Sequence, residues 1–364
     1  MKKILKSLAY LMAFAVTFSS CSKSTDTGTP TSSSITITLN KQTISADGFD
    51  EATVTVKDES GADVTANSSI IVNGSIISGN KISVNFGTTG TSYEVYAAKN
   101  NAISNKLTLN FTNPGPSKYS TKVLVEDCTG AWCGWCPRLA YKFDNFMVNN
   151  SRIFMVGVHN GDTYALSSVE SSLRAKFGVN SFPSGIVNRS RTFNDNGNIS
   201  SLADSTDLGT YLRTRMVTGL AINTTISGNT LNVTTKVGFD GNVSQSLKLV
   251  VMLVQDNIVL AQTNYYNANN SYPGNPYYSS GNPVTNFVHK NVLRSTPTGI
   301  LGADITGASQ TKNGEYTASH AINITGLPSA NLKVVAFVVF ADGQTKSGIL
   351  NAQWVAAGQN KAYD

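Results

Sequence analysis

The segment that most constrains the fold is an apolar run followed by two closely spaced cysteines and a helical pattern. "KVLVEDCTG" is typical of a buried strand that ends in a turn, and "AWCGWCPR" follows it directly. The next stretch, "PRLAYKFDNFMVN", repeats apolar side chains at helical spacing. We therefore expect the chain to pass from a strand into a helix across Cys133 and Cys136.

Further strands and helices are predicted after this junction. "RIFMVGVH" and "SFPSGIVNRS" have strand patterns, "SSVESSLRAKFGV" is helical, and "DLGTYLRTRMV" is expected to form a last helix near Val217. Strands that alternate with helices indicate an α/β domain with a partly parallel sheet, here over residues 118–217.

Both flanks of this domain show β patterns. Residues 35–113 alternate polar and β-branched side chains over about seven short segments, which predicts a small β-sandwich, and "NPGPSK" reads as a linker. Residues 220–364 are β-rich again, and their two nearly continuous apolar runs, 247–254 and 334–340, are expected at the centre of a second sandwich. The predicted fold is multidomain, with an α/β domain between two β-sandwiches.

A long loop and a short motif interrupt the last predicted domain. The loop, residues 264–287, is rich in Tyr, Asn, Gly and Pro, and a segment of this length without regular structure is either functional or an inert excursion. "FVHKNVLR" follows it and carries His289, Lys290 and Arg294 at helical spacing, which favours a short helix.

The N-terminus has the pattern of an export signal. "MKKILK" is basic, and the apolar stretch after it is too short for an ordinary membrane-spanning helix. With "SSC" before a polar run, residues 1–20 resemble a bacterial lipoprotein signal, although Phe18 stands where an aliphatic residue is usual. The resemblance implies that Cys21 is acylated, with palmitate among its lipids, and that residues 21–34 form a tether. A plain secretory signal is the alternative.

The charge of the chain argues against nucleic acid as a partner. Three of the 28 basic residues lie in the signal segment, which leaves 25 against 22 acidic residues, and no basic block follows. Export also places the cysteines in a compartment where disulfides persist.

The two spaced cysteines suit thiol chemistry. A cysteine at a helix N-terminus has its thiolate stabilised by the helix dipole, and a second one about a turn further on can attack a mixed disulfide. Cys133 and Cys136 fit these two roles, and Trp132 offers a flat apolar surface beside them. A static disulfide is the main alternative. A zinc site would need two further ligands, and only Cys128 and three distant histidines are available, so neither a metal nor another cofactor is expected.

"VLVEDCTGAWCGWCPRLAYKF" resembles the active-site segment of thioredoxin-fold thiol–disulfide oxidoreductases. The resemblance implies that Cys133 is the nucleophile, that Cys136 resolves the mixed disulfide and that the two form a disulfide when oxidised. It also implies that Asp127 is the buried carboxylate that moves a proton, and that Pro183 in "NSFPSG" is the cis-proline that receives the substrate chain.

The aromatic residues next to these positions are expected to contact a substrate; they are Trp132, Trp135 and Phe182. Trp135 departs from the family, because proline is common between the two cysteines. Glu126, next to Asp127, is a second candidate for the carboxylate that moves a proton, although the six-residue offset to Cys133 favours Asp127. Cys128 is interpreted as a small core residue, with a regulatory disulfide as the alternative.

A wider resemblance covers residues 118–364. A lipoprotein signal, a CxxC-bearing thioredoxin-like domain and a C-terminal β domain with "FVHKNVLR" are similar to the outer membrane protein 28 family of Bacteroidota. "ADGFDEATVTVKDESGADVT" resembles bacterial immunoglobulin-like domains, so residues 35–113 are expected to be an immunoglobulin-like addition.

Two functions stay open at this point. One is a lipid-anchored envelope protein that exchanges thiols and disulfides with exported proteins. The other is a non-catalytic interaction lipoprotein whose disulfide is structural. The outer membrane is the expected location for both, with the periplasmic face slightly favoured because no acidic cluster follows Cys21. A homodimer is one option for the oligomeric state.

Overall fold

The computed structural model describes residues 34–194, 212, 215–269, 275–344 and 346–364. Most of these residues lie in β-strands of several sheets, and helices are few. The predicted signal, Cys21 and nearly all of the tether lie outside the described residues, as does most of the helix predicted near Val217. Within the described ranges, no helix has the length and apolar character to cross a membrane.

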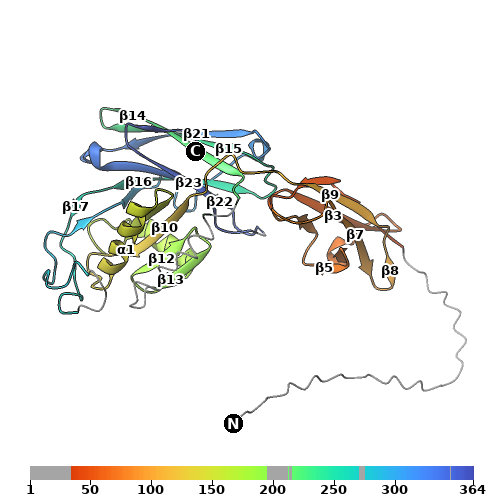
Figure 1. Cartoon of the computed structure of the whole chain (residues 1–364), viewed down its shortest axis with the longest axis horizontal. Helices are drawn as coiled ribbons and strands as arrows, with labels where there is room; N and C mark the ends of the chain where they lie inside the picture. Colours follow the sequence, from red (N-terminus) through yellow and green to blue (C-terminus); the bar gives the residue numbers. More distant parts are fainter. Residues whose placement is uncertain (1–33, 195–211, 213–214, 270–274, 345) are drawn as a thin grey trace, which may run out of the picture.

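Residues 34–113 form an N-terminal module set to one side of the remaining chain (Figure 1). One sheet has the strand order β1-β3-β6 and the other has the order β2-β9-β7-β4-β5, with β8 paired to β7. The nine strands, against about seven predicted, are β1 (Ile35–Leu39), β2 (Thr43–Ser45), β3 (Glu51–Asp58), β4 (Ser69–Val72), β5 (Ser75–Ile77), β6 (Lys81–Ser83), β7 (Ser92–Lys99), β8 (Ala102–Ile103) and β9 (Leu107–Thr112).

The module has a hydrophobic core of its own. Alternate side chains of its strands point inward, so that apolar residues of both sheets meet in one cluster. The module touches the remaining chain through the turn at Phe49, whose ring lies 6.3 Å from that of Phe340. Nearby, the Glu51 amide donates to Ser244 Oγ at 3.1 Å. A small contact of this kind lets the module fold as a separate unit.

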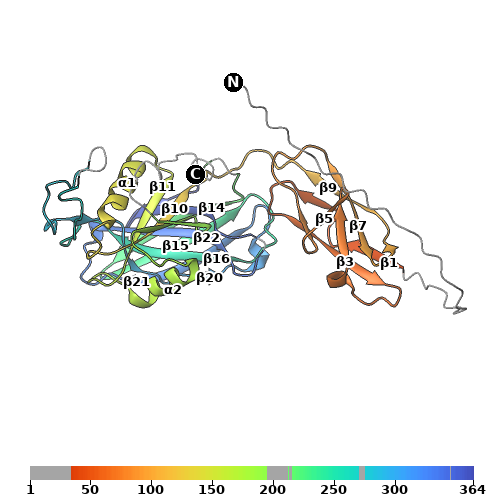
Figure 2. The same ribbon diagram turned by 90° about the horizontal axis from the view of Figure 1, so that it is seen from below.

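The predicted strand–helix alternation is present in the central part of the chain. Its elements are β10 (Val123–Thr129), α1 (Cys136–Asn149), β11 (Ile153–His159), α2 (Ser167–Phe177), β12 (Ser184–Val187) and β13 (Arg191–Asn194). β10 and β11 are parallel, whereas β12 runs antiparallel to β10 and β13 antiparallel to β12. The two helices lie on opposite sides of these strands (Figure 2).

Side chains of β10 alternate between the two helices. Val123 and Val125 pack with Leu139 and Phe143 of α1. Leu124 belongs to the cluster that contains α2. Because successive strand residues point to opposite faces, each position of β10 is assigned to one helix or the other.

The C-terminal part adds strands to the sheet of the central part. The order β13-β12-β10-β11-β19-β16-β22-β23 runs through both parts, and β20 pairs with β16. The predicted boundary between residues 217 and 220 therefore divides elements that share a sheet. The added strands are β16 (Leu247–Gln255), β19 (Val292–Ser295), β20 (Ala303–Asp304), β22 (Leu332–Phe340) and β23 (Ile349–Ala356).

A smaller sheet, β21-β15-β14-β24, covers one face of these strands. Its strands are β14 (Thr218–Ser227), β15 (Thr230–Phe239), β21 (Glu315–Asn323) and β24 (Asn360–Lys361). The other faces of β16 and β22 belong to the core that contains α2. Burial on both faces explains why these two strands read as continuous apolar runs.

The short helix predicted for "FVHKNVLR" is wrong. The segment forms β18 (Val288–His289), which pairs with β17 (Ile258–Val259), and β19, which lies between β11 and β16. Asn291, with φ of 49°, separates the two strands. Pairing with strands distant in the sequence outweighs the local spacing of three side chains.

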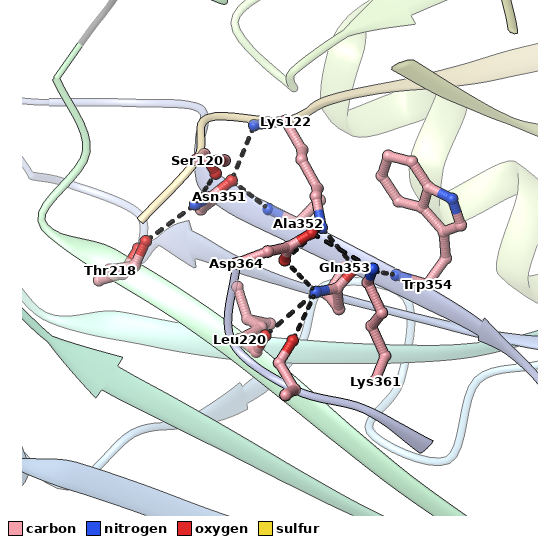
Figure 3. A network of polar contacts seen from close by, with 11 residues as sticks. Ser120, Lys122, Thr218, Leu220, Asn351, Ala352, Gln353, Trp354, Lys361 and Asp364 are labelled. Atoms are coloured by element: carbon pink, nitrogen blue, oxygen red, sulfur yellow. Dashed lines mark hydrogen bonds and ion pairs between the residues drawn. The ribbon is translucent and has the colours of Figure 1, made fainter. Parts of the chain in front are cut away.

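A buried polar network joins the start of the central part to the C-terminal strands (Figure 3). Lys122 Nζ donates to Gln353 Oε1 at 2.5 Å and to both carboxylate oxygens of Asp364 at 2.8 Å. Asn351 Nδ2 donates to the carbonyls of Ser120 and Thr218. The network holds the segment that leads into β10 against β14 and β23.

Candidate functional site

The two cysteines of the CGWC motif form the predicted disulfide. They lie between the end of β10 and the start of α1, and the bond closes a turn of four residues. α1 begins at Cys136, so Cys133 sits in the turn before the helix, where the Cys133 amide donates to the Gly130 carbonyl. Only 4% of Cys133 and 1% of Cys136 is exposed, which shields the disulfide from solvent.

Two predicted aromatic contacts lie at the surface beside the disulfide. Trp132 and Trp135 are 47% and 43% exposed. The ring of Trp132 meets that of Phe182 edge-on, with 5.4 Å between the centroids. Pro183, which is buried, follows Phe182 through the cis peptide bond that the resemblance implies. The residues just before β12, Phe182 and Pro183, therefore lie next to the CGWC turn.

The start of the Tyr-rich loop lies directly on this turn. We call residues 262–269 the cover segment. Its backbone donates from Thr263 to the Ala131 carbonyl at 2.8 Å and from Tyr265 to the Gly134 carbonyl at 3.0 Å. Gln262 Nε2 donates to the Cys133 carbonyl at 2.8 Å. The cover segment thus donates hydrogen bonds to these three backbone carbonyls of the turn that carries the disulfide.

Aromatic packing strengthens this contact. The rings of Tyr265 and Tyr266 both lie 5.2 Å from the Trp135 ring, each in an edge-on arrangement. A Cβ atom at Gly134 would lie 2.4 Å from the Tyr265 ring, so with Tyr265 in this place only glycine fits at position 134. The guanidinium of Arg138 lies over the Tyr266 ring at 5.5 Å. Trp135, which replaces the usual proline, is therefore an anchor for the cover segment.

A small cavity lies behind the disulfide, on the α1 side of the sheet. Its volume is about 40 Å³, and its lining includes Asp127, Cys136, His159, Gln262 and His289. These residues come from β10, α1, β11, the cover segment and β18. Asp127, predicted from its offset to Cys133, thus lines the same cavity as Cys136.

Two buried histidines face each other at this cavity. The rings of His159 and His289 are 5.0 Å apart. His159 Nδ1 lies 2.7 Å from Asp162 Oδ2, and Asp162 also accepts the amide of Ala131 in the CGWC turn. Burial, together with the neighbouring His159, lowers the pKa of His289 to about 4, so His289 is neutral at pH 7.

Asp162 remains ionised despite its partial burial. Burial by itself would raise its pKa, but the hydrogen bond from His159 and the backbone amides of Ala131 and Tyr164 hold the pKa of Asp162 below its ordinary value of 3.8. An ionised Asp162 accepts hydrogen bonds from both the histidine and the CGWC turn.

Glu126 and Cys128 lie on the opposite face of β10 from the disulfide. Arg189 donates to both carboxylate oxygens of Glu126, at 2.8 and 2.6 Å, and both side chains are buried. Cys128 is a free thiol in the core beside α2, and its burial raises the pKa of the thiol well above the ordinary value. The sheet separates both residues from the CGWC cysteines.

The sequence interpretation missed the roles of Gln262 and Asp162 in holding the CGWC turn. "HNGD" follows an apolar strand, and polar residues at the end of a parallel strand are a signal for a site. No signal in the sequence links Gln262 to the turn. Among the described residues, no group of three His, Cys, Asp or Glu side chains is arranged to hold a metal ion.

A family model and a solved structure are similar to parts of this chain. The model of the family described as "Outer membrane protein Omp28" matches residues 170–361, which include Pro183, the cover segment and His289 but begin after the CGWC motif. The solved structure of HBP35 of Porphyromonas gingivalis is similar, with a TM-score of 0.53 and 18% identity, over 66% of this chain and 76% of that chain. At this identity the likeness concerns the fold alone. No curated protein matches the chain.

Proposed function

The chain belongs to the outer membrane protein Omp28 family, and from this premise we propose that it is an envelope protein of the outer membrane whose CGWC motif exchanges thiols and disulfides with other proteins. The observation that carries the proposal is the disulfide itself, closed between a strand end and a helix start, with Asp127 behind it and Pro183 brought near it through Trp132 and Phe182.

The proposed chemistry assigns one role to each cysteine. In the reduced protein, the thiolate of Cys133 attacks a substrate disulfide, which forms a mixed disulfide and releases one substrate thiol. Cys136 then attacks the sulfur of Cys133, which releases the second substrate thiol and restores the bond between the two cysteines. The N-terminus of α1 favours the attacking thiolate. The reverse sequence would oxidise a substrate dithiol.

The proposal also covers the central part, the N-terminal module and the membrane anchor. The strand order β13-β12-β10-β11, with a helix on each face, supports a thioredoxin-like central part. Two sheets around one core support an immunoglobulin-like module that spaces the site from the membrane. Lipid on Cys21 would supply the anchor, on the periplasmic face.

The cover segment imposes a condition on this function. Because Cys133 is almost fully buried, a protein substrate reaches its sulfur only after the cover segment has moved away from the CGWC turn. Exchange is therefore expected to be slow with large substrates and to speed up when the contacts of the cover segment are removed.

The test is a redox titration of the purified chain. After equilibration in glutathione buffers, free thiols are trapped with a maleimide and counted by mass spectrometry, and the reduction of insulin is assayed in parallel. We expect Cys133 and Cys136 to open together, whereas Cys128 reacts only after unfolding. C136A should accumulate mixed disulfides through Cys133, and the matched variant C128A should not.

A second function, an interaction protein with a structural disulfide, is favoured by the near-complete burial of both cysteines under the cover segment. If the bond stays closed in every glutathione buffer and insulin is not reduced, this second function replaces the first.

A further inference from the structure

We propose that His159, held by Asp162, takes the proton from Cys136 when Cys136 resolves the mixed disulfide. The inference deepens the proposed function and rests on it. It assigns a catalytic role to a residue that lies outside the CGWC motif and that the thioredoxin resemblance does not supply.

The first support is that the Cys136 thiol and the His159 imidazole line the same pocket. Cys136 and His159 both line the cavity of about 40 Å³ behind the disulfide, and Asp127 and Thr129 line it as well. A polar cavity of this volume has room for ordered water. Water in this pocket would link the sulfur of Cys136 to the imidazole of His159.

The second support is the fixed tautomer of His159. An ionised carboxylate only accepts hydrogen bonds, so the contact of 2.7 Å with Asp162 Oδ2 keeps the proton on Nδ1 of His159. The other ring nitrogen, Nε2, is then the acceptor. Asp162 also binds the Ala131 amide, so the same carboxylate fixes the distance between the CGWC turn and the imidazole.

The third support is the glycine that leaves the space open. Gly157 of β11 pairs with Asp127 of β10, and Thr129 pairs with His159 two residues later. All four side-chain positions face α1, and Gly157 alone has no side chain to fill the gap. A Cβ at Gly157 would lie 3.6 Å from the Lys290 carbonyl and 3.9 Å from the His159 ring, which is ordinary contact.

The charged groups around His159 are compatible with this role. Asp127 approaches from β10, Asp144 from α1, and Lys290 and the neutral His289 from the β18 segment. Asp162 and the ring of Tyr164 approach from the loop after β11. Asp144 is paired with Lys290 at 2.8 Å, so these two charges offset each other, and Asp162 is the carboxylate in direct contact with the imidazole.

The proposed step conserves atoms and charge. In the mixed disulfide, the thiol of Cys136 loses its proton to Nε2 of His159, and the thiolate attacks the sulfur of Cys133. The bond between Cys133 and the substrate sulfur breaks, and the substrate leaves as a thiolate that takes up a proton from solvent. The imidazolium beside Asp162 then returns its proton to solvent.

The experiment follows one turnover of the reduced chain with glutathione disulfide as the probe. Acid quenching and mass spectrometry measure the formation of the mixed disulfide at Cys133 and its resolution by Cys136, between pH 5 and pH 9. General-base assistance is worth about 10²- to 10⁴-fold. With Asp127 still present, we expect H159Q to slow resolution at pH 7 by about tenfold or more and to leave formation of the mixed disulfide unchanged.

The pH profile separates a chemical role from a structural one. Histidines change charge between about pH 5 and pH 8, so the wild-type resolution rate should show an inflection that H159Q lacks. The variant rate should approach that of the wild type near pH 9, where thiols ionise without help. D162N should behave like H159Q, because an amide that donates to Nδ1 moves the ring proton to Nε2. H320Q, which changes a histidine on β21, is the matched control and should match the wild type.

A further variant keeps the test decisive if H159Q fails to fold. G157A adds one methyl group to the cavity without a close contact, and it should slow resolution more than formation. Two results overturn the inference. If the wild type forms no mixed disulfide, the proposed function fails together with the inference. If the wild type exchanges and H159Q, D162N or G157A retains its resolution rate and pH profile, only the inference fails.

Discussion

The two faces of strand β10 carry similar residue types in different settings. On the α2 face, Glu126 is locked in a buried ion pair with Arg189, and Cys128 is a core thiol. On the α1 face, Asp127 lines a cavity next to Cys136 and the paired His159. A carboxylate and a cysteine thus belong to the core on one face and line a cavity on the other.

Glu126 and Asp127 differ in the groups that surround their carboxylates. Glu126 accepts two short hydrogen bonds from the Arg189 guanidinium, so both of its carboxylate oxygens are held in the ion pair. Asp127 instead faces a space that holds a thiol and an imidazole. Changes on the α2 face should therefore affect folding stability, and changes on the α1 face should affect exchange or its dependence on pH.

The largest expected effect comes from breaking the ion pair on the α2 face. Replacing Glu126 by Ala leaves the buried charge of Arg189 without its partner, and we expect the free energy of unfolding to fall by about 3–5 kcal/mol. Urea denaturation measures the loss. The double variant E126L/R189M, which removes both charges, should recover most of it.

The exchange rate of folded E126A should equal that of the wild type, because Glu126 lies across the sheet from the disulfide. A loss of exchange in folded E126A would contradict the separation of the two faces.

The next effect concerns the pH dependence of stability on the α1 face. The pKa of His289 is about 4 in the folded protein and ordinarily about 6.5. Between these values the unfolded chain binds a proton that the folded protein does not, so stability is highest above pH 6.5 and falls as the pH drops to 4. A shift of about 2.5 pH units corresponds to a loss of about 3 kcal/mol.

Urea denaturation at pH 7 and at pH 4.5 checks this expectation. The drop between the two conditions should be smaller by most of that amount in H289Q, whatever the stability of this variant at pH 7. An equal drop in the wild type and in H289Q would show that His289 is readily protonated in the folded protein.

The smallest expected change in stability is at the cover segment. Replacing Gln262 by Ala removes a donor from the carbonyls of Cys133 and Gly130, and we expect a loss of about 1–3 kcal/mol. The cover segment should then leave the CGWC turn more often, and iodoacetamide should alkylate Cys133 of the reduced protein faster. Q359A, at an exposed glutamine, should change neither quantity, and an unchanged alkylation rate in Q262A would show that the cover segment does not limit access.

The sequence predicted the disulfide between Cys133 and Cys136. The apolar run, the spacing of the two cysteines and the helical pattern after them placed the disulfide at a strand–helix junction. The six-residue offset selected Asp127 over Glu126, and the alternation of side chains along β10 gives the physical reason, because only one of two neighbours can face α1.

Contacts between distant segments could not be predicted in this way. The helical spacing in "FVHKNVLR" led to a wrong helix, since nothing in the eight residues encodes their pairing with β11, β16 and β17. The same long-range pairing brings His289 to within 5.0 Å of His159 and lays Gln262 on the CGWC turn.

The sequence alone determined the local elements: which segments become strands or helices, where the cysteines lie and which face of β10 each residue takes. These properties depend on neighbours within a few positions along the chain. Only the tertiary structure decided that the central and C-terminal parts share one sheet, that the cover segment lies on the CGWC turn and that two histidines meet at the cavity beside Cys136. Those contacts join residues more than 100 positions apart, and they form because apolar faces and strand edges must be covered wherever the partner lies in the chain.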